Sequence, residues 1–215
     1  KIKLSLLGTE LPDIKKPLFK KNSFKLLYVG RLEKRKGTIE FFDAIPQILN
    51  SNLKITINIV GKDINQAPGQ RSFQEYFNKV VPENLRNRVR LYGVATSNEL
   101  KKFYAGCDAF IAPSRYESFG LIYLAAMADG KPVIGTRAGG IPEIVKHKKV
   151  GLLIGVNDST QIAEAVLKLF SREKLREKLG KEAFTYVRQN FSNEKFAENS
   201  LKIYKQAREK FYGRS

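Results

Sequence analysis

The feature that most constrains this chain is a regular alternation between short apolar runs and segments with helical spacing. Residues 24–29 form an apolar run that ends at Gly30, and a helical stripe follows over residues 38–49. Pro46 should kink or shorten the last turn of that helix, because proline lacks the backbone N–H that a helix needs. The expected strands are residues 24–29, 53–60, 89–92, 109–112, 132–135 and 151–154.

Strands that alternate with helices favour a parallel sheet covered on both faces. We therefore expect a doubly wound, Rossmann-like α/β fold with a six-stranded parallel sheet and a helical C-terminal tail over residues 171–215. The tail should break near Gly180 and Asn190, with Ser192 capping the last helix. In such sheets ligands bind at the carboxyl ends of the strands. The loops at those ends are residues 30–37, 61–69, 93–96, 113–120 and 135–141.

Charge and cysteine content limit the classes of protein that fit. The formal net charge of +18 implies attraction to an anion, although a lysine-rich solvated surface explains most of it. The single cysteine, Cys107, excludes an internal disulfide, suits a reducing compartment and is interpreted as a small buried residue. His147 lies in a lysine-rich turn and is given no role. No signal peptide is read at the start, and no run reaches the roughly 20 apolar residues of a membrane helix.

The loop after the first strand carries two cations between two glycines. Arg31 and Lys36 lie between Gly30 and Gly37, close to a strand end and a helix start, which suits a phosphate or diphosphate. The glycine spacing matches neither the dinucleotide-binding fingerprint nor the P-loop. A basic, solvated turn would have much the same sequence, so the loop alone decides nothing.

Two later loops carry an acid and a pair of glycines. Glu117 precedes a helix start, where the free N–H groups of Gly120 and Leu121 would point at a bound anion. The alternative is that Glu117 is a first-turn acid favoured by the helix dipole. Gly139 and Gly140 precede a helix opened by proline, which indicates either a second anion site or an ordinary tight turn.

Together these loops form an ordered set of motifs. The set is Val29-Gly-Arg-Leu-x-x-x-Lys36-Gly37, Pro113-Ser-x-x-Glu117-x-Phe-Gly-Leu121, Gly-Lys-Pro-Val-Ile134 and Gly139-Gly-x-Pro-Glu143. It resembles the donor-binding half of retaining glycosyltransferases of family 4, which have the two-domain GT-B architecture. The resemblance extends over residues 24–205.

The resemblance implies a role for each matching position. Arg31 and Lys36 would contact the donor diphosphate, and the amides of Gly120 and Leu121 would bind its distal phosphate. Glu117, as the catalytic residue, would bind the sugar hydroxyls, and Gly139 and Gly140 would line the sugar pocket. The loop at Gly93 and Val94 would contact the nucleobase. Members of the family keep the anomeric configuration and need no bound metal. The resemblance therefore implies a nucleoside-diphosphate sugar as substrate, with no metal and no further cofactor.

The chain departs from the family pattern in two ways. The family has a second Glu eight residues after the first, where it holds the nucleotide ribose, and this chain has Ala125 there. Residues 1–22 resemble an interdomain linker and residues 23–215 the donor domain, so the N-terminal acceptor domain is expected to be missing. In that case the fragment alone should be inactive, and an exposed apolar strip is expected on residues 197–211 or around the ligand loops, where the missing domain would pack.

These observations predict the donor-binding half of a retaining, nucleotide-sugar-dependent hexosyltransferase that acts on a sugar or a lipid-linked acceptor. The expected location is the cytoplasm, with a peripheral contact to an anionic membrane at its inner surface. The first alternative is a catalytically degenerate GT-B domain with a non-enzymatic binding role, which Ala125 supports. The second is a nucleic-acid or membrane-binding module, which the charge suggests. It ranks low because the sequence has no nucleic-acid-binding motif.

Overall fold

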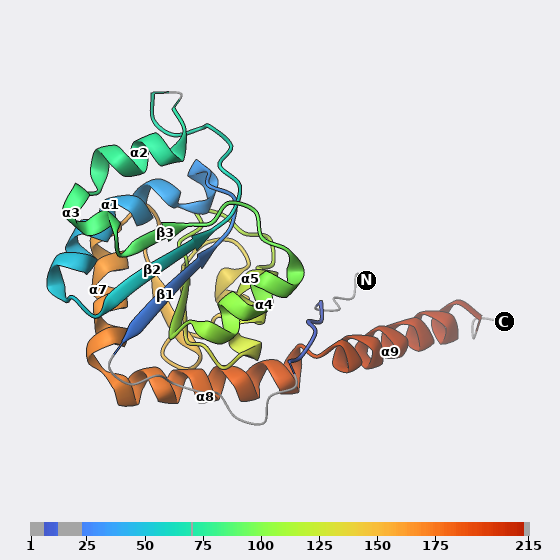
Figure 1. Ribbon diagram of the computed structural model, residues 1–215. Coiled ribbons are helices and arrows are strands. Elements are labelled where there is room, and N and C mark those ends of the chain that lie inside the picture. The colour runs from blue at the N-terminus through green and yellow to red at the C-terminus, as the bar shows by residue number, and fades with distance from the viewer. Residues whose placement is uncertain (1–6, 13–22, 70, 213–215) are drawn as a thin grey trace.

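The computed structural model describes residues 7–12, 23–69 and 71–212, and it confirms the doubly wound α/β fold. The sheet has six parallel strands in the order β3-β2-β1-β4-β5-β6 (Figure 1). The strand order reverses between β1 and β4, which lie side by side, and ligands bind at such a switch point. The strands are β1 (Phe24–Val29), β2 (Ile55–Val60), β3 (Val89–Leu91), β4 (Ala109–Ala112), β5 (Val133–Thr136) and β6 (Gly151–Ile154).

Helices cover both faces of this sheet, and each face has its own apolar core. In β1, Leu26 belongs to one core and Leu27 to the other, as the alternation of side chains along a strand requires. The helices are η1 (Lys34–Lys36), α1 (Thr38–Ser51), α2 (Phe73–Val80), α3 (Glu83–Arg86), α4 (Ser97–Gly106), α5 (Leu121–Ala128), α6 (Ile141–Ile144), α7 (Ser159–Ser171), α8 (Glu173–Asn190) and α9 (Asn193–Tyr212).

The first core lies under α1, α2, α3 and α7, and the second lies under α4, α5 and α6. In the first core the Phe42 ring meets Phe73 and Phe77 of α2 edge to face, at 6.1 and 5.6 Å between ring centroids. Helix α8 joins the two layers, because Leu179 belongs to the first core and Val187 to the second.

Side-chain caps fix where several helices begin. The Thr96 hydroxyl accepts a hydrogen bond from the Glu99 N–H at 3.3 Å, and the two residues form the capping box that the Thr-x-x-Glu spacing of the sequence predicts at the start of α4. Asp158 caps α7, as an Asp just before a helical stripe predicts, and accepts an N–H bond at 2.8 Å, while the expected cap Ser192 accepts one at 3.1 Å. A second capping box, between Ser72 and Glu75, begins α2 and was not expected.

One expected helix break is absent, and Pro46 does not shorten its helix. Helix α8 continues through Gly180, so the break predicted there is wrong, whereas the break after Asn190 is confirmed. A glycine costs a helix interior about 1 kcal/mol, but Gly180 is buried, and α8 as a whole packs against α5 and α7. Helix α1 runs past Pro46 to Ser51, so it is not shortened, and Ile48 and Leu49 beyond the proline are fully buried.

The last helix lies apart from the body of the domain (Figure 1). Helix α9 has no buried residue, and Leu201, Tyr204 and Phe211 are 59%, 71% and 77% exposed, which confirms the expected exposed strip. Of the expected linker, residues 1–6 and 13–22 lie outside the described residues, while the Thr9 N–H donates to the Phe191 carbonyl at 2.8 Å. In the described part of the chain, no helix is both long enough and apolar enough to cross a membrane.

Candidate functional site

The loops that follow β1 and β4 meet at the switch point of the sheet. Gly37 has a φ of 69°, and a Cβ atom on it would lie 1.9 Å from the carbonyl oxygen of Pro113. The Arg115 N–H donates to the Arg35 carbonyl at 2.8 Å, which fixes the second loop against the first. A glycine is therefore required at position 37, because any side chain would push the two main chains apart.

Buried hydroxyls hold the first loop in place from below. The Tyr28 hydroxyl lies 3.0 Å from the Thr38 hydroxyl and donates to the Arg31 carbonyl at 3.2 Å. Thr38 in turn bonds the main chain of Glu33 at both its N–H and its carbonyl. Burial raises the pKa of Tyr28 well above its ordinary value, so the phenol stays protonated and keeps its role as a donor.

Four of the five cations of the two loops pair with three acids. The Lys36 ammonium pairs with the Glu117 carboxylate, and the two side chains are 14% and 15% exposed. Arg31 pairs instead with Glu33 at 3.3 Å, which it shares with Arg35 at 2.7 Å. The fourth pair joins Arg115 of the second loop to Glu40 of α1. The structure thus joins the predicted residues Lys36 and Glu117, and it places Arg31 beside them at an exposed rim.

Helix α5 begins directly after this ion pair. Its N-cap is Gly120, with a φ of 97°, and no side chain caps the helix start. The N–H groups of the first turn, including that of Leu121, thus have no side-chain acceptor, and they carry the positive end of the helix dipole. Tyr123 lies directly below, where it donates to the Ala112 carbonyl and where burial raises the pKa of its phenol.

The two glycines of the third loop contact the main chain on either side of Glu117. A Cβ atom on Gly139 would lie 2.4 Å from the Glu117 carbonyl oxygen, and one on Gly140 would lie 2.3 Å from that of Ser118. The Gly140 N–H also donates to the Glu117 carbonyl at 2.8 Å. Both glycines therefore support the acid from behind, which adds a structural reason for them beside the predicted lining of a sugar pocket.

The predicted nucleobase loop lies further along the same side of the sheet. Gly93 and Val94 follow β3, which β2 separates from β1. The Gly93 carbonyl accepts a hydrogen bond from the Gly61 N–H at 2.7 Å, so the loops after β2 and β3 are joined. Val94 is 75% exposed, so its side chain is open to a ligand.

Ala125 lines a cavity between α4, α5 and residues 9–12. The cavity measures about 570 Å³ and also contains the side chains of Asp129, Lys101 and Glu10. Burial raises the pKa of Asp129 from 3.8 to about 6, against the lowering effect of Lys131. Position 125, where the resemblance places a carboxylate, thus has none. The easily protonated carboxyl group of Asp129 lies one helical turn further along the chain.

The sequence did not identify the acids that hold the loop cations. Glu33 and Glu40 are 7% and 8% exposed, which is rare for carboxylates unless they are paired. Glu33 lies among arginines and lysines, as an acid of a solvated loop also would, and Glu40 lies in the first turn of α1, where an acid is common. The two unassigned residues have structural roles, since burial raises the pKa of Cys107 to about 12 and His147 accepts the Leu153 N–H at 2.9 Å.

This arrangement can bind an anion and a hydroxyl-bearing group side by side. The positive end of α5 and the Lys36 ammonium favour the anion, and the Glu117 carboxylate accepts hydrogen bonds from hydroxyls. Among the described residues, no group of three histidine, cysteine or acidic side chains is placed to hold a metal ion.

The fold and this site define a class, the C-terminal domain of glycosyltransferases with GT-B architecture. The family model described as glycosyl transferases group 1 matches residues 11–186, and the chain belongs to that family.

Individual relatives agree with the family. An uncharacterized glycosyltransferase of Methanocaldococcus jannaschii is 31% identical over 186 residues, which are 86% of this chain and 45% of the relative. The chain thus spans less than half of that protein. Sucrose-phosphate synthase of Thermosynechococcus elongatus superposes with a TM-score of 0.80 at 28% identity, over 95% of this chain and 52% of the synthase. Anabaena HepE, solved in complex with UDP, gives 0.72 at 25% identity, over 86% and 49% of the two chains.

Proposed function

We propose that residues 23–215 are the donor-binding half of a retaining hexosyltransferase that uses a nucleoside-diphosphate sugar. The observation that carries the proposal is the Lys36–Glu117 ion pair at the start of α5, at the switch point of the sheet. It puts a cation, a helix N-terminus and a hydroxyl acceptor within one ligand's reach. A diphosphate joined to a sugar requires all three.

In this proposal the leaving diphosphate is the centre of catalysis. Lys36 and Arg31 contact its oxygens, and the amides of Gly120 and Leu121 receive its distal phosphate. Fixed donors of this kind stabilise the charge that develops as the bond between sugar and phosphate breaks. These groups supply the positive charge, so the proposal includes no metal ion and no further cofactor.

The remaining contacts position the sugar and the base. Glu117 binds the sugar hydroxyls as the catalytic residue, beside Gly139 and Gly140. The loop at Gly93 and Val94 contacts the nucleobase. The UDP complex of HepE, a structural relative, supports a nucleoside diphosphate as the ligand.

The rest of the reaction takes place with groups outside residues 23–215. We propose that residues 1–22 lead from an acceptor domain, which binds a sugar or a lipid-linked acceptor. We propose a cytoplasmic protein whose basic surface, part of a formal net charge of +18, contacts an anionic membrane at its inner surface. Nucleic acid is not among the proposed partners.

Calorimetry with UDP, GDP and ADP on this chain tests the donor site. We expect at least one of them to bind, and Arg31→Ala and Lys36→Ala each to weaken binding by roughly 1–3 kcal/mol. Lys34→Ala is the matched control in the same loop and should have a much smaller effect. Arg31 is 58% exposed, so its variant should fold even if loss of the buried Lys36 partner destabilises the chain. Equal losses at all three positions would indicate nonspecific electrostatics.

Glu117→Gln separates binding from transfer. The variant keeps the size of the side chain and should retain nucleotide affinity. The Glu117 carboxylate, which competes with a phosphate for Lys36, is removed, and no other anion replaces it. In the full-length protein it should nearly abolish transfer. Unchanged turnover would return Glu117 to the role of an acid that stabilises the helix start.

A catalytically degenerate domain is the second candidate, and Ala125 favours it. A methyl group cannot accept hydrogen bonds from ribose hydroxyls, and the cavity beside it holds no carboxylate closer along α5 than Asp129. If none of the three nucleotides binds this chain, and Ala125→Glu in a folded variant restores none of them, the non-enzymatic role replaces the donor site.

A further inference from the structure

A basic hollow lies on the other side of the sheet from α1, over β1, β2 and β3. Along β2 the residues Ile55, Ile57 and Ile59 are buried in the core beneath α1. The alternate residues Thr56 and Asn58 face the opposite way and are exposed and half-buried. This part of the sheet is polar, as a strand face that no helix seals should be.

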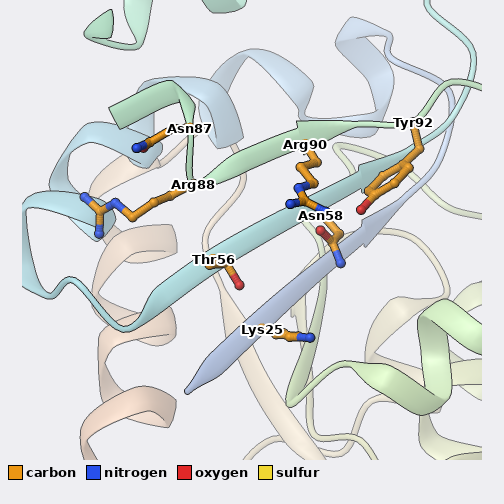
Figure 2. A pocket seen from close by; sticks show the side chains of 7 residues that line it. All are labelled: Lys25, Thr56, Asn58, Asn87, Arg88, Arg90 and Tyr92. Atoms are coloured by element: carbon orange, nitrogen blue, oxygen red, sulfur yellow. The ribbon is translucent and has the colours of Figure 1, made fainter. Parts of the chain in front are cut away.

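Two adjoining cavities are formed on this face. The first measures about 210 Å³, and the second, about 360 Å³, extends toward α4. Lys25, Asn58 and Tyr92 line both, so the two form one groove. In Figure 2, Arg90, Asn58 and Tyr92 project toward one another over β2, whereas Asn87 and Arg88 lie at the other end of β3. The first cavity is lined by Lys25, Thr56, Asn58, Asn87, Arg88, Arg90 and Tyr92.

The groove carries an excess of positive charge. Its first cavity has no acidic residue in its lining, and Glu99 in the second is occupied by the main chain and hydroxyl of Thr96, both at 2.8 Å. Neither Lys25 nor Arg90 forms a side-chain ion pair with any residue whose position the structure gives. Arg88 is fixed by the carbonyls of Asn52 and Leu49, at 2.7 and 2.8 Å. These two hydrogen bonds hold the Arg88 guanidinium at the end of the groove.

We propose that this groove binds a soluble anionic sugar, such as a sugar phosphate. The Arg90 guanidinium matches the geometry of a phosphate or carboxylate, and Lys25 adds a second charge. The Asn58 amide and the Thr56 hydroxyl match sugar hydroxyls. Tyr92, 41% exposed, offers a ring for the apolar face of a sugar, and its centroid lies 4.6 Å from that of Phe103, which supports it.

The charged end of the groove is separate from the proposed diphosphate site, whereas its second cavity reaches Val94 of the loop proposed to contact the nucleobase. Lys25 is near the amino end of β1, whereas Arg31 and Lys36 follow its carboxyl end. At about 3.3 Å per residue, Lys25 lies roughly 16 Å along the strand from Gly30. Asn58 is half-buried and both cavities are hollows in the surface, which suits a small ligand better than a flat lipid surface. Binding through Lys25 and Arg90 therefore does not require a nucleotide.

Titration calorimetry with glucose 6-phosphate, and with glucose as the uncharged match, tests the groove on this chain. Glucose 6-phosphate should bind, glucose should bind at least about tenfold more weakly, and Arg90→Met and Lys25→Met should each weaken glucose 6-phosphate about tenfold. Arg208→Met removes the same charge from an exposed position on α9 and should leave the affinity within about twofold, as expected for a charge outside the site.

Three results would overturn the proposal. Failure of glucose 6-phosphate to bind would do so, and so would an equal loss in Arg208→Met, which would indicate nonspecific attraction. A loss in Arg31→Met with none in Arg90→Met would place the sugar phosphate in the donor site instead. Sedimentation with phosphatidylglycerol vesicles forms the last arm, because Arg90-dependent vesicle binding without glucose 6-phosphate binding would assign the groove to a membrane.

Discussion

In the ion pair between Lys36 and Glu117, each side chain depends on the other for a partner of opposite charge. Both side chains are largely buried, so removal of either would leave a charge without its partner in a poorly solvated place. In the proposed reaction a diphosphate pairs with Lys36 in place of Glu117. The Glu117 carboxylate is then free to accept hydrogen bonds from the sugar hydroxyls. Lys36 is thus a residue on which binding and positioning both depend.

Asp129 provides a pH-dependent prediction at the same scale. Its folded pKa of about 6 lies above the ordinary 3.8, so the folded chain favours the protonated acid. The contribution of Asp129 to the free energy of unfolding is fully present below about pH 4 and is lost as the pH rises through 6. Asp129→Asn should therefore raise the free energy of unfolding at pH 7, by about 1 kcal/mol once the shift is discounted for solvent screening.

Urea unfolding at pH 4 and pH 7 measures this effect. The stability difference between Asp129→Asn and the parent chain should be small at pH 4 and should grow in favour of the variant at pH 7. Glu164→Gln on α7 is a control whose effect should not follow that pattern. A variant less stable than the parent at pH 7 would contradict the prediction.

At the scale of elements, the site depends on loops that touch through their main chains. Gly139 has a φ of 53°, so Gly139→Ala strains the backbone and also forces the new methyl group away from the Glu117 carbonyl. We expect the substitution to cost about 1–3 kcal/mol in the free energy of unfolding, the usual range for a strained backbone conformation. It should also lower transfer in the full-length protein, because Glu117 must shift.

Gly106→Ala is the matched control, measured by the same urea unfolding. No atom lies within 4 Å of the Cβ that it would add, and Gly106 is the last residue of α4. Its stability should be unchanged or slightly higher, since alanine restricts the unfolded chain. A Gly139→Ala variant as stable as Gly106→Ala would show that the third loop does not press on the acid.

The elements themselves followed from local sequence, and the contacts between them did not. Apolar periodicity and the Thr96 and Asp158 caps predicted strands and helices, because these depend on neighbours along the chain. Lys36 and Glu117 were both identified, yet their pairing joins residues 81 positions apart. Arg115 and Glu40 were missed for the same reason, at a separation of 75. The break expected at Gly180 failed because burial outweighed a local cost, in a helix that packs against α5 and α7.

At the scale of the whole molecule, α9 is an amphipathic helix with an exposed apolar strip. Leu201, Tyr204 and Phe211 recur at helical spacing and are all exposed, as expected if this helix packs on an acceptor domain. In this chain the exposed strip should cause self-association. Leu201→Glu combined with Tyr204→Glu should shift sedimentation velocity profiles toward the monomer at high protein concentration.

The control for α9 changes the net charge by the same amount, two units more negative, at the neighbouring surface. Lys202→Ala combined with Lys205→Ala changes two exposed residues of the same helix and leaves the apolar strip intact. It should sediment like the parent chain. If both double variants behave alike, charge rather than apolar surface controls association, and α9 has no docking role.

The glycine contacts among the three loops also determine how this domain could be re-engineered. Gly37 touches Pro113, and Gly139 touches Glu117, so the loops after β1, β4 and β5 form one interlocked unit. Transplanting one of them from a relative with another donor preference would bring a mismatched main chain against its neighbours. A specificity graft must therefore exchange all three together, and a library that varies them separately would mostly sample misfolded combinations.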